Sequence, residues 1–271
     1  PSAKITFVPD GEYQEDSSLV YATKGSRPIN IDPSSQAVPT SSSRKALATM
    51  VQEHSVGNDF LLVSPKGEGK TTLAREFASL LGHETHLYAM NTEMTSQHLL
   101  QRRSTDPSTG ETVWEDSPLL RAARRGDLCV LDGIEKLRPD VLSSIQSLIV
   151  DRDIQLPDGK RALRHDRIGT GDGNAIVEVH QSFRVIALAS SPRGEEGSRW
   201  MTPNLFAMFS TIRLPLLREE CLRAILKRYA SSDDESSVDT ILQLREQLSD
   251  SVAEECGIAP LSTRNMVRAV R

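Results

Sequence analysis

The feature that most constrains the fold of this chain is a glycine-rich turn with the sequence SPKGEGKTT at residues 64–72. The turn stands between a short apolar run and an amphipathic stretch, which predicts a strand, a loop and a helix in that order. Gly67 and Gly69 allow the backbone to turn tightly, so that successive N–H groups point at an anion. The positive end of the following helix adds to this attraction. The stretch therefore predicts a phosphate-binding loop.

The same turn follows the pattern of a nucleotide phosphate loop, which is glycine, four residues, then glycine, lysine and serine or threonine. Lys70 offers an ammonium group to the β and γ phosphates, and the Thr71 hydroxyl is a ligand for Mg²⁺. Ser64 replaces the first glycine, at the base of the loop where a small residue suffices. The alternative is a glycine turn that only precedes a capped helix, and the strand–loop–helix context disfavours it. We therefore assign ATP binding to the whole loop, which comprises Pro65, Lys66, Gly67, Glu68, Gly69, Lys70, Thr71 and Thr72.

The rest of the chain alternates apolar strands with helices, which predicts an α/β fold with a parallel sheet covered on both faces. Strands are expected at residues 60–63, 86–90, 128–131 and 183–189, and helices at 47–52, 71–81, 117–125 and 139–149. Beyond Pro215 only helical stripes remain, one of which comprises Ile241, Leu244, Leu248 and Val252. The sequence thus predicts a phosphate-loop sandwich followed by a helical lid.

Three parts of the chain are expected from these patterns. Residues 1–43 form an N-terminal β-extension and linker, with strand patterns at 5–8 and 19–22 and a linker rich in serine and proline at 32–43. Residues 44–215 form the α/β nucleotide-binding domain, and residues 216–271 form the lid. Because the chain begins with proline rather than methionine, we expect it to be a fragment of a longer protein.

A second candidate for the phosphate site is Asp132, which ends the apolar run LCVLD. Such a carboxylate holds the water shell of Mg²⁺ in phosphate-loop ATPases. Gly133 follows it, and Glu135 lies two residues further on, about 6–7 Å along the strand if the strand continues.

These two motifs resemble those of AAA+ ATPases, and further stretches resemble the MoxR and dynein-related branch of that family. Residues 102–136 resemble its helix-2 insertion, in which a β-hairpin interrupts a helix, and residues 155–164 resemble its second hairpin. Residues 184–192 resemble the sensor-1 strand, and residues 261–268 resemble the sensor-2 helix.

The resemblance implies a catalytic set that comprises Lys70, Asp132, Glu135, Ser191 and Arg264, with Thr71 and Asp132 as Mg²⁺ ligands. Arg264 would be the γ-phosphate sensor, and Ser191 stands where the family usually has asparagine. Most members place a glutamate directly after the aspartate, where this chain has Gly133. Glu135 is therefore a candidate displaced base, although a solvated acid at a helix start is an equally good interpretation. Met208 stands where the arginine finger would be, a residue worth orders of magnitude in phosphoryl transfer.

The DGIEK sequence at residues 132–136 is most similar to internal modules of a large multi-module mitochondrial type of ATPase within this branch. The resemblance covers roughly residues 44–271. It implies a mitochondrial location and, as partners, neighbouring AAA+ modules of the same chain or of a homo-oligomer. It does not identify a client protein.

Composition disfavours several other classes of protein. The net charge of −5 and the 4% of aromatic residues argue against a nucleic-acid partner. No apolar run approaches the roughly 20 residues of a membrane helix, so no membrane insertion is expected. The 3 cysteines and 6 histidines show no paired metal-binding spacing.

Two functions remain open from the sequence. The intact phosphate loop, Asp132 and Arg264 favour an AAA+ module that hydrolyses ATP at a low rate within a remodelling ATPase. Gly133 and Met208 favour the alternative, a nucleotide-binding structural or regulatory module that does not hydrolyse ATP.

Overall fold

Short apolar runs form a five-stranded parallel sheet at the centre of the molecule. In spatial order its strands are β12 (Ser210–Arg213), β3 (Phe60–Ser64), β11 (Arg184–Ser190), β7 (Leu128–Asp132) and β4 (Thr85–Ala89). Ala187 of β11 lies opposite both Leu61 of β3 and Leu131 of β7. The structure, a computed structural model, describes residues 2–7, 18–25, 27, 38–168, 175–191, 202–230, 235–248 and 261–270. Because the strands are parallel, their carboxyl ends gather at one edge of the sheet, where ligands bind in such folds.

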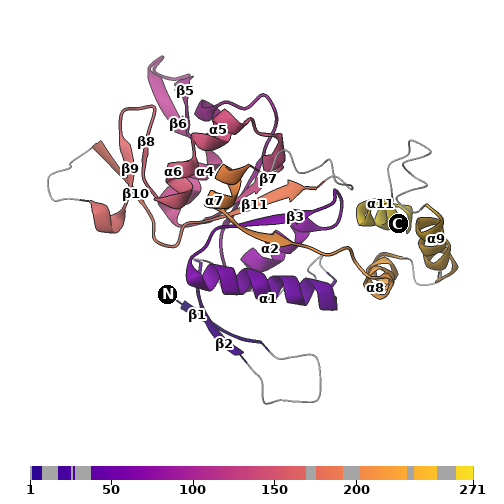
Figure 1. The fold of residues 1–271 in the computed structure, drawn as a ribbon. Coiled ribbons are helices and arrows are strands. Elements are labelled where there is room, and N and C mark those ends of the chain that lie inside the picture. The colour runs from indigo at the N-terminus through magenta and orange to yellow at the C-terminus, as the bar shows by residue number, and fades with distance from the viewer. Residues whose placement is uncertain are drawn as a thin grey trace.

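Alternate residues of the strands point to opposite faces of the sheet, and helices cover both faces (Figure 1). Phe60 and Leu62 pack against α1 (Ser41–Val56) and α2 (Lys70–Leu81). Leu61 and Val63 pack on the opposite side. The helices on that side are α3 (Ser96–Leu99), α4 (Pro118–Arg125), α5 (Pro139–Ser143), α6 (Gln146–Val150) and α7 (Pro203–Met208). The predicted α/β fold with a doubly covered parallel sheet is therefore confirmed.

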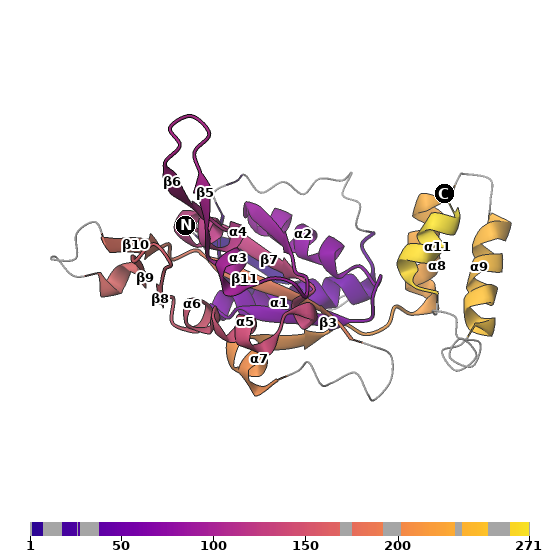
Figure 2. The ribbon, with the colours of Figure 1, turned by 90° about the horizontal axis from the view of Figure 1, so that it is seen from above.

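Three C-terminal helices form a separate cluster beside the sheet layers (Figure 2). They are α8 (Glu219–Tyr229), α9 (Glu235–Gln247) and α11 (Thr263–Val270), and they share a small core of buried side chains, namely Leu222, Leu226, Val238, Leu242 and Met266.

The buried face of α9 agrees with the sequence prediction only in part, since Leu248 is half-buried as expected but Leu244 is not. Val238 and Leu242, one helical turn apart, face α8, whereas Leu244 is 44% exposed. Ile241 is partly buried beside them, and Val252 lies outside the described residues. The prediction is wrong at Leu244 because α9 packs on its neighbours along a row that includes Val238 and Leu242.

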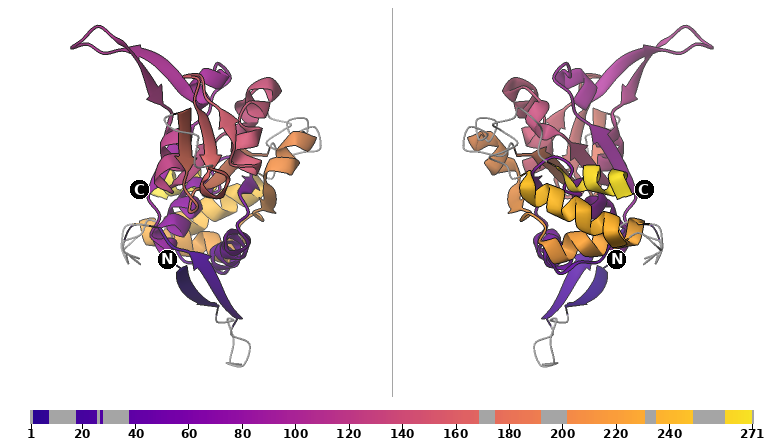
Figure 3. Two further views of the ribbon diagram at one scale, coloured as in Figure 1. Left: turned by 90° about the vertical axis from the view of Figure 1, so that its left-hand side faces the viewer. Right: turned by 90° about the vertical axis from the view of Figure 1, so that its right-hand side faces the viewer.

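Two hairpins extend from the sheet layers at the positions that the family resemblance implied. Strands β5 (Gln101–Thr105) and β6 (Thr112–Asp116) pair antiparallel between α3 and α4 and project away from the body (Figure 3). Strands β8 (Ile154–Gln155) and β9 (Arg161–Arg164) form the second hairpin, which the 3₁₀ turn η2 (His165–Arg167) follows. The sequence did not predict β10 (Ile176–Val179), which adds parallel to β9.

The predicted helix at residues 139–149 is instead two short helices, α5 and α6. Ser143 and Ser144 lie at the break, and their hydroxyls donate to the carbonyls of Pro139 and Val141 at 2.8 and 2.6 Å. Such side-chain bonds to the preceding turn compete with the helical pattern. The apolar residues predicted to share one face are nevertheless buried, namely Val141, Ile145, Leu148 and Ile149, whereas Val150 is 50% exposed.

The expected linker at residues 32–43 ends earlier than predicted, because α1 begins at Ser41. Ser43 N donates to Thr40 Oγ1 at 3.1 Å, and Thr40 N donates to Ser43 Oγ at 2.9 Å. This reciprocal pair satisfies backbone N–H groups that a helix start otherwise leaves unpaired. The serine run is therefore a helix cap, whereas residues 32–37 lie outside the described residues.

The N-terminal strands β1 (Ser2–Phe7) and β2 (Ser18–Thr23) pair antiparallel, as the strand patterns predicted, and residue 8 lies outside the described residues. Ala22 is buried against the α1 and α2 layer. Gly25 N donates to Leu81 O at 3.0 Å, and Arg27 N donates to Gly82 O at 2.9 Å. A side chain at Gly25 would lie 2.2 Å from Gly82 O, so this contact requires glycine. The strand pair is therefore attached to the end of α2.

Candidate functional site

The phosphate loop lies between the carboxyl end of β3 and the start of α2, as predicted. Gly67 and Gly69 have φ angles of +89° and +87°, which side chains rarely allow. Lys70 folds back over the loop, where its Nζ donates to Ser64 O at 2.8 Å and to Pro65 O at 2.9 Å. The ammonium is thus held against the base of the loop by the carbonyls of its first residues.

Asp132 and Thr71 meet although they are far apart in the sequence. The Thr71 hydroxyl donates to Asp132 Oδ2 at 3.1 Å, which brings two oxygen atoms together at the carboxyl edge of the sheet. Oxygen atoms of this kind are the ligands that Mg²⁺ prefers.

Glu135 also lies at this site, but it stands on a turn after β7 and not on the strand itself. Gly133 has a φ of +87° and ends β7, and the 3₁₀ turn η1 (Ile134–Lys136) follows. Gly133 N donates to Leu188 O at 2.9 Å, which anchors the turn to β11. The expectation that Glu135 lies further along a continuing strand is therefore wrong. Its Oε2 atom is buried and, within the described residues, has no hydrogen-bond partner.

Burial and the charged side chains around Lys70 shift its pKa. Burial lowers the pKa of Lys70, and the carboxylates of Glu135, Asp132 and Glu68 oppose that shift, whereas Arg264 adds to it. The site therefore brings together three acidic and two basic side chains before any ligand is considered.

The lid cluster touches the loop directly through the start of α11. Arg264 N donates to Gly67 O at 3.2 Å, and Thr263 Oγ1 donates to Glu68 Oε2 at 2.6 Å. A side chain added at Gly67 would lie 2.6 Å from the hydroxyl oxygen of Ser262. The sequence identified Arg264, but the contact between Thr263 and Glu68 had no signal in the sequence, because it joins residues almost 200 positions apart.

A cavity of about 370 Å³ opens beside the loop, within the range of about 300–1,000 Å³ usual for small-molecule sites. Polar residues such as Thr72 and Arg264 line it together with apolar side chains such as Leu73, Leu217 and Ile225. Glu76 of α2 also lines it, and burial raises the pKa of this carboxyl group. The sequence analysis did not single out Glu76.

Ser191 and Met208 occupy different surroundings. Ser191 follows β11, and its N–H donates to Ser64 O at 3.1 Å, so it lies next to the base of the loop. Met208 ends α7 and is 6% exposed within the core on the other side of the sheet. The Met208 side chain therefore packs in the core and brings no charge to this position.

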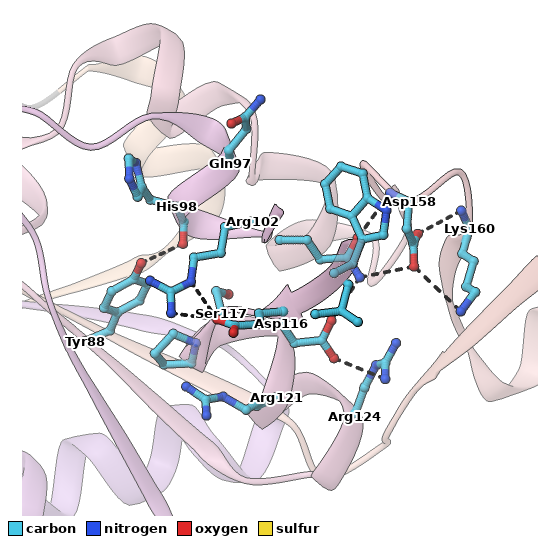
Figure 4. Close-up of a pocket in the computed structure, with 15 residues that line it drawn as sticks. Tyr88, Gln97, His98, Arg102, Asp116, Ser117, Arg121, Arg124, Asp158 and Lys160 are labelled. Atoms are coloured by element: carbon cyan, nitrogen blue, oxygen red, sulfur yellow. Dashed lines mark hydrogen bonds and ion pairs between the residues drawn. The ribbon is translucent and has the colours of Figure 1, made fainter. Parts of the chain in front are cut away.

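A larger cavity of about 990 Å³ lies at the base of the β5–β6 hairpin and contains none of the predicted nucleotide residues (Figure 4). Tyr88 donates from its hydroxyl to His98 O at 2.6 Å, and Arg124 pairs with Asp116 at 3.1 Å. Arg102 pairs with Glu115 at 2.6 Å. The polar residues that line this hollow thus largely pair with one another.

Comparisons with known proteins agree with this geometry. Residues 59–209 match the family described as "AAA domain (dynein-related subfamily)". The chain is 36% identical over 250 residues to mouse von Willebrand factor A domain-containing protein 8, an alignment that covers 86% of this chain and 13% of that protein. It is 37% identical over 106 residues to Protein NorQ of Paracoccus denitrificans, covering 38% of each. The chain therefore spans only a minor part of these relatives.

A solved structure, that of NtrX from Brucella abortus, shares the fold with a TM-score of 0.54 at 17% identity, covering 86% of this chain and 49% of that one. The similarity to the dynein-related branch that the sequence predicted is confirmed. Among the described residues, no helix has the length and apolar character needed to cross a bilayer.

Proposed function

Because the chain belongs to the dynein-related subfamily of AAA domains, we propose that it binds Mg-ATP between the phosphate loop and α11, as one module of a larger remodelling ATPase. The observation that carries this proposal is the convergence of Lys70, Asp132, Glu135 and Arg264 around one loop. These residues come from the start of α2, the end of β7, the turn after it and the lid cluster.

In this proposal the loop and its flanking residues hold the phosphates. The backbone N–H groups of residues 66–72 would surround them, and Lys70 would supply a positive charge. Thr71 and Asp132 would hold Mg²⁺, because their oxygen atoms already lie 3.1 Å apart at the edge of the sheet. The ion, when bound, neutralises charge on the phosphates. The apolar part of the adjoining cavity would take the nucleoside.

Glu135 is the residue that would permit slow hydrolysis despite Gly133. Its buried Oε2 atom has no hydrogen-bond partner in the described part of the chain, so it is available to accept a proton from a water molecule. Ser191, next to the loop, would take the sensor-1 position. Arg264 would contact the γ-phosphate from α11.

The alternative is a module that binds nucleotide without turning it over. Met208 supports this alternative, because its burial leaves no arginine finger at that position. In both cases residues 216–271 would act as a lid on residues 44–215, with residues 1–43 as an extension. Neighbouring AAA+ modules would be the partners.

A mitochondrial location follows by resemblance to the multi-module relatives. The net charge of −5 supports a partner other than nucleic acid.

Calorimetry with Mg-ATP, alongside phosphate release, tests the proposal on the wild type and on Lys70→Ala. Loss of an ammonium–phosphate contact should weaken binding about 10- to 100-fold. Lys45→Ala, on an exposed position of α1, is the matched control and should bind like the wild type. Absence of Mg-ATP binding by the wild type would refute the proposal.

Glu135→Gln separates the two functions. If Glu135 is the base, turnover should fall about 100-fold or more while binding is kept. Wild-type binding without any turnover would favour the regulatory module.

A further inference from the structure

The phosphate loop contains one carboxylate more than the proposed chemistry uses. Asp132 would hold Mg²⁺ and Glu135 would serve as the base, whereas Glu68 lies between the two glycines of the loop itself. Glu68 is only 9% exposed. A buried negative charge here repels a phosphate chain, and a carboxylate turned toward the loop N–H groups would compete with the phosphates for them.

The structure shows where this carboxylate is held. The Thr263 hydroxyl donates to Glu68 Oε2 at 2.6 Å, a bond that is buried and joins the loop to the start of α11. Charge-assisted hydrogen bonds from a hydroxyl to a carboxylate are short and strong, and this distance lies within their usual range of about 2.5–2.7 Å. The adjacent residue, Arg264, donates its backbone N–H to Gly67 O at 3.2 Å. Two consecutive residues of the lid therefore contact two consecutive residues of the loop.

We propose that Thr263 is a positioning residue, which holds the Glu68 carboxylate against α11 and so keeps the phosphate-binding N–H groups open to the nucleotide. The inference rests on the proposed function, because it concerns the same nucleotide site. In this view, phosphate binding requires the contact between lid and loop, and so does the sensing of the γ-phosphate by Arg264. Since every nucleotide polyphosphate uses the loop, the effect applies to Mg-ADP and Mg-ATP alike.

The variant Thr263→Val keeps the shape of the side chain and removes its donor. The Glu68 carboxylate is then free to turn toward the phosphate-binding N–H groups. The affinity for both nucleotides should therefore fall about tenfold, a change of the size expected for one charge-assisted hydrogen bond. Thr263→Ser keeps the hydroxyl and should bind close to wild type. Glu68→Gln removes the repelling charge and should bind both nucleotides more tightly than the wild type.

The decisive measurement is calorimetry with Mg-ADP and Mg-ATP on the double variant Glu68→Gln/Thr263→Val. If Thr263 acts by restraining the carboxylate, removal of the charge restores the affinity that Thr263→Val loses. A residue that only packs the lid against the loop would give no such rescue. Thr240→Val on α9 is the matched control, because its exposed hydroxyl donates to Ser236 O at 2.8 Å within the same lid cluster.

Wild-type affinity in Thr263→Val, or a double variant as weak as Thr263→Val, would overturn the inference while leaving nucleotide binding intact. If Thr263→Val does not fold, Glu68→Gln alone still tests the inference, because weaker nucleotide binding by that variant would contradict a repulsive carboxylate. A wild type that binds neither nucleotide would instead refute the proposed function itself.

Discussion

Replacing Gly133 with glutamate would restore the acid that most relatives carry after the aspartate, yet we expect it to harm the protein rather than activate it. Gly133 has a φ of +87°, a conformation that costs a residue with a side chain about 1–2 kcal/mol. An added Cβ would also lie 3.1 Å from the Nζ atom of Lys136, which must move aside. For a domain of this size the melting temperature should therefore fall by about 2–8 °C. Differential scanning fluorimetry measures this fall, and phosphate release measures turnover.

The matched control for this variant is Gly159→Ala in the β8–β9 hairpin. Gly159 has nearly the same φ of +86°, but no heavy atom lies within 4 Å of an added Cβ. The melting temperature of Gly159→Ala should fall only by the conformational cost of its positive φ. That of Gly133→Ala should fall slightly more, because its Cβ also meets Lys136. A Gly133→Glu protein with an unchanged melting temperature and faster ATP turnover would refute the reasoning, because it would mean that the turn after Asp132 does not depend on glycine.

Three further predictions concern contacts other than those that would hold the phosphates. Arg152→Ala should destabilise the protein by about 3–5 kcal/mol in urea unfolding, because it leaves Asp59 buried without the ion pair formed at 2.8 Å. Thr40→Ala should cost about 0.5–2 kcal/mol in the same assay, since it removes the cap of α1. Burial raises the pKa of the Cys129 thiol, so it stays protonated and unreactive. Iodoacetamide at pH 8.5 should leave the Cys129 peptide unlabelled until urea is added, as peptide mass spectrometry would show.

Much of the nucleotide site could be predicted because its signals are local in the sequence. The loop at residues 64–72 combines glycines, lysine and threonine in adjacent positions, and Asp132 ends a continuous apolar strand. Both motifs lie at the carboxyl edge of a parallel sheet once the strands are recognised. The sequence therefore predicted both the sheet and its ligand-binding edge.

The position of Glu135 could not be predicted, because it depends on the positive φ angle at which the chain turns at Gly133. The contact of Thr263 with Glu68 depends on how the lid packs, and no local pattern records that. The buried face of α9 is a further example, because Val238 and Leu242 are buried by packing against α8 and α11, which helical periodicity alone does not predict. At Ser144 a side-chain hydrogen bond interrupted a helix whose apolar spacing was continuous.

The attachment of the N-terminal strand pair to α2 has a mechanical consequence. Helix α2 spans Lys70–Leu81, 12 residues, and is therefore about 18 Å long. One end carries the phosphate loop, and the other is held by backbone hydrogen bonds from Gly25 and Arg27. A pulling force on the N-terminal segment would thus be applied along a stiff rod that ends at the phosphates. Tension from a preceding part of a longer chain would reach the nucleotide without passing through the lid.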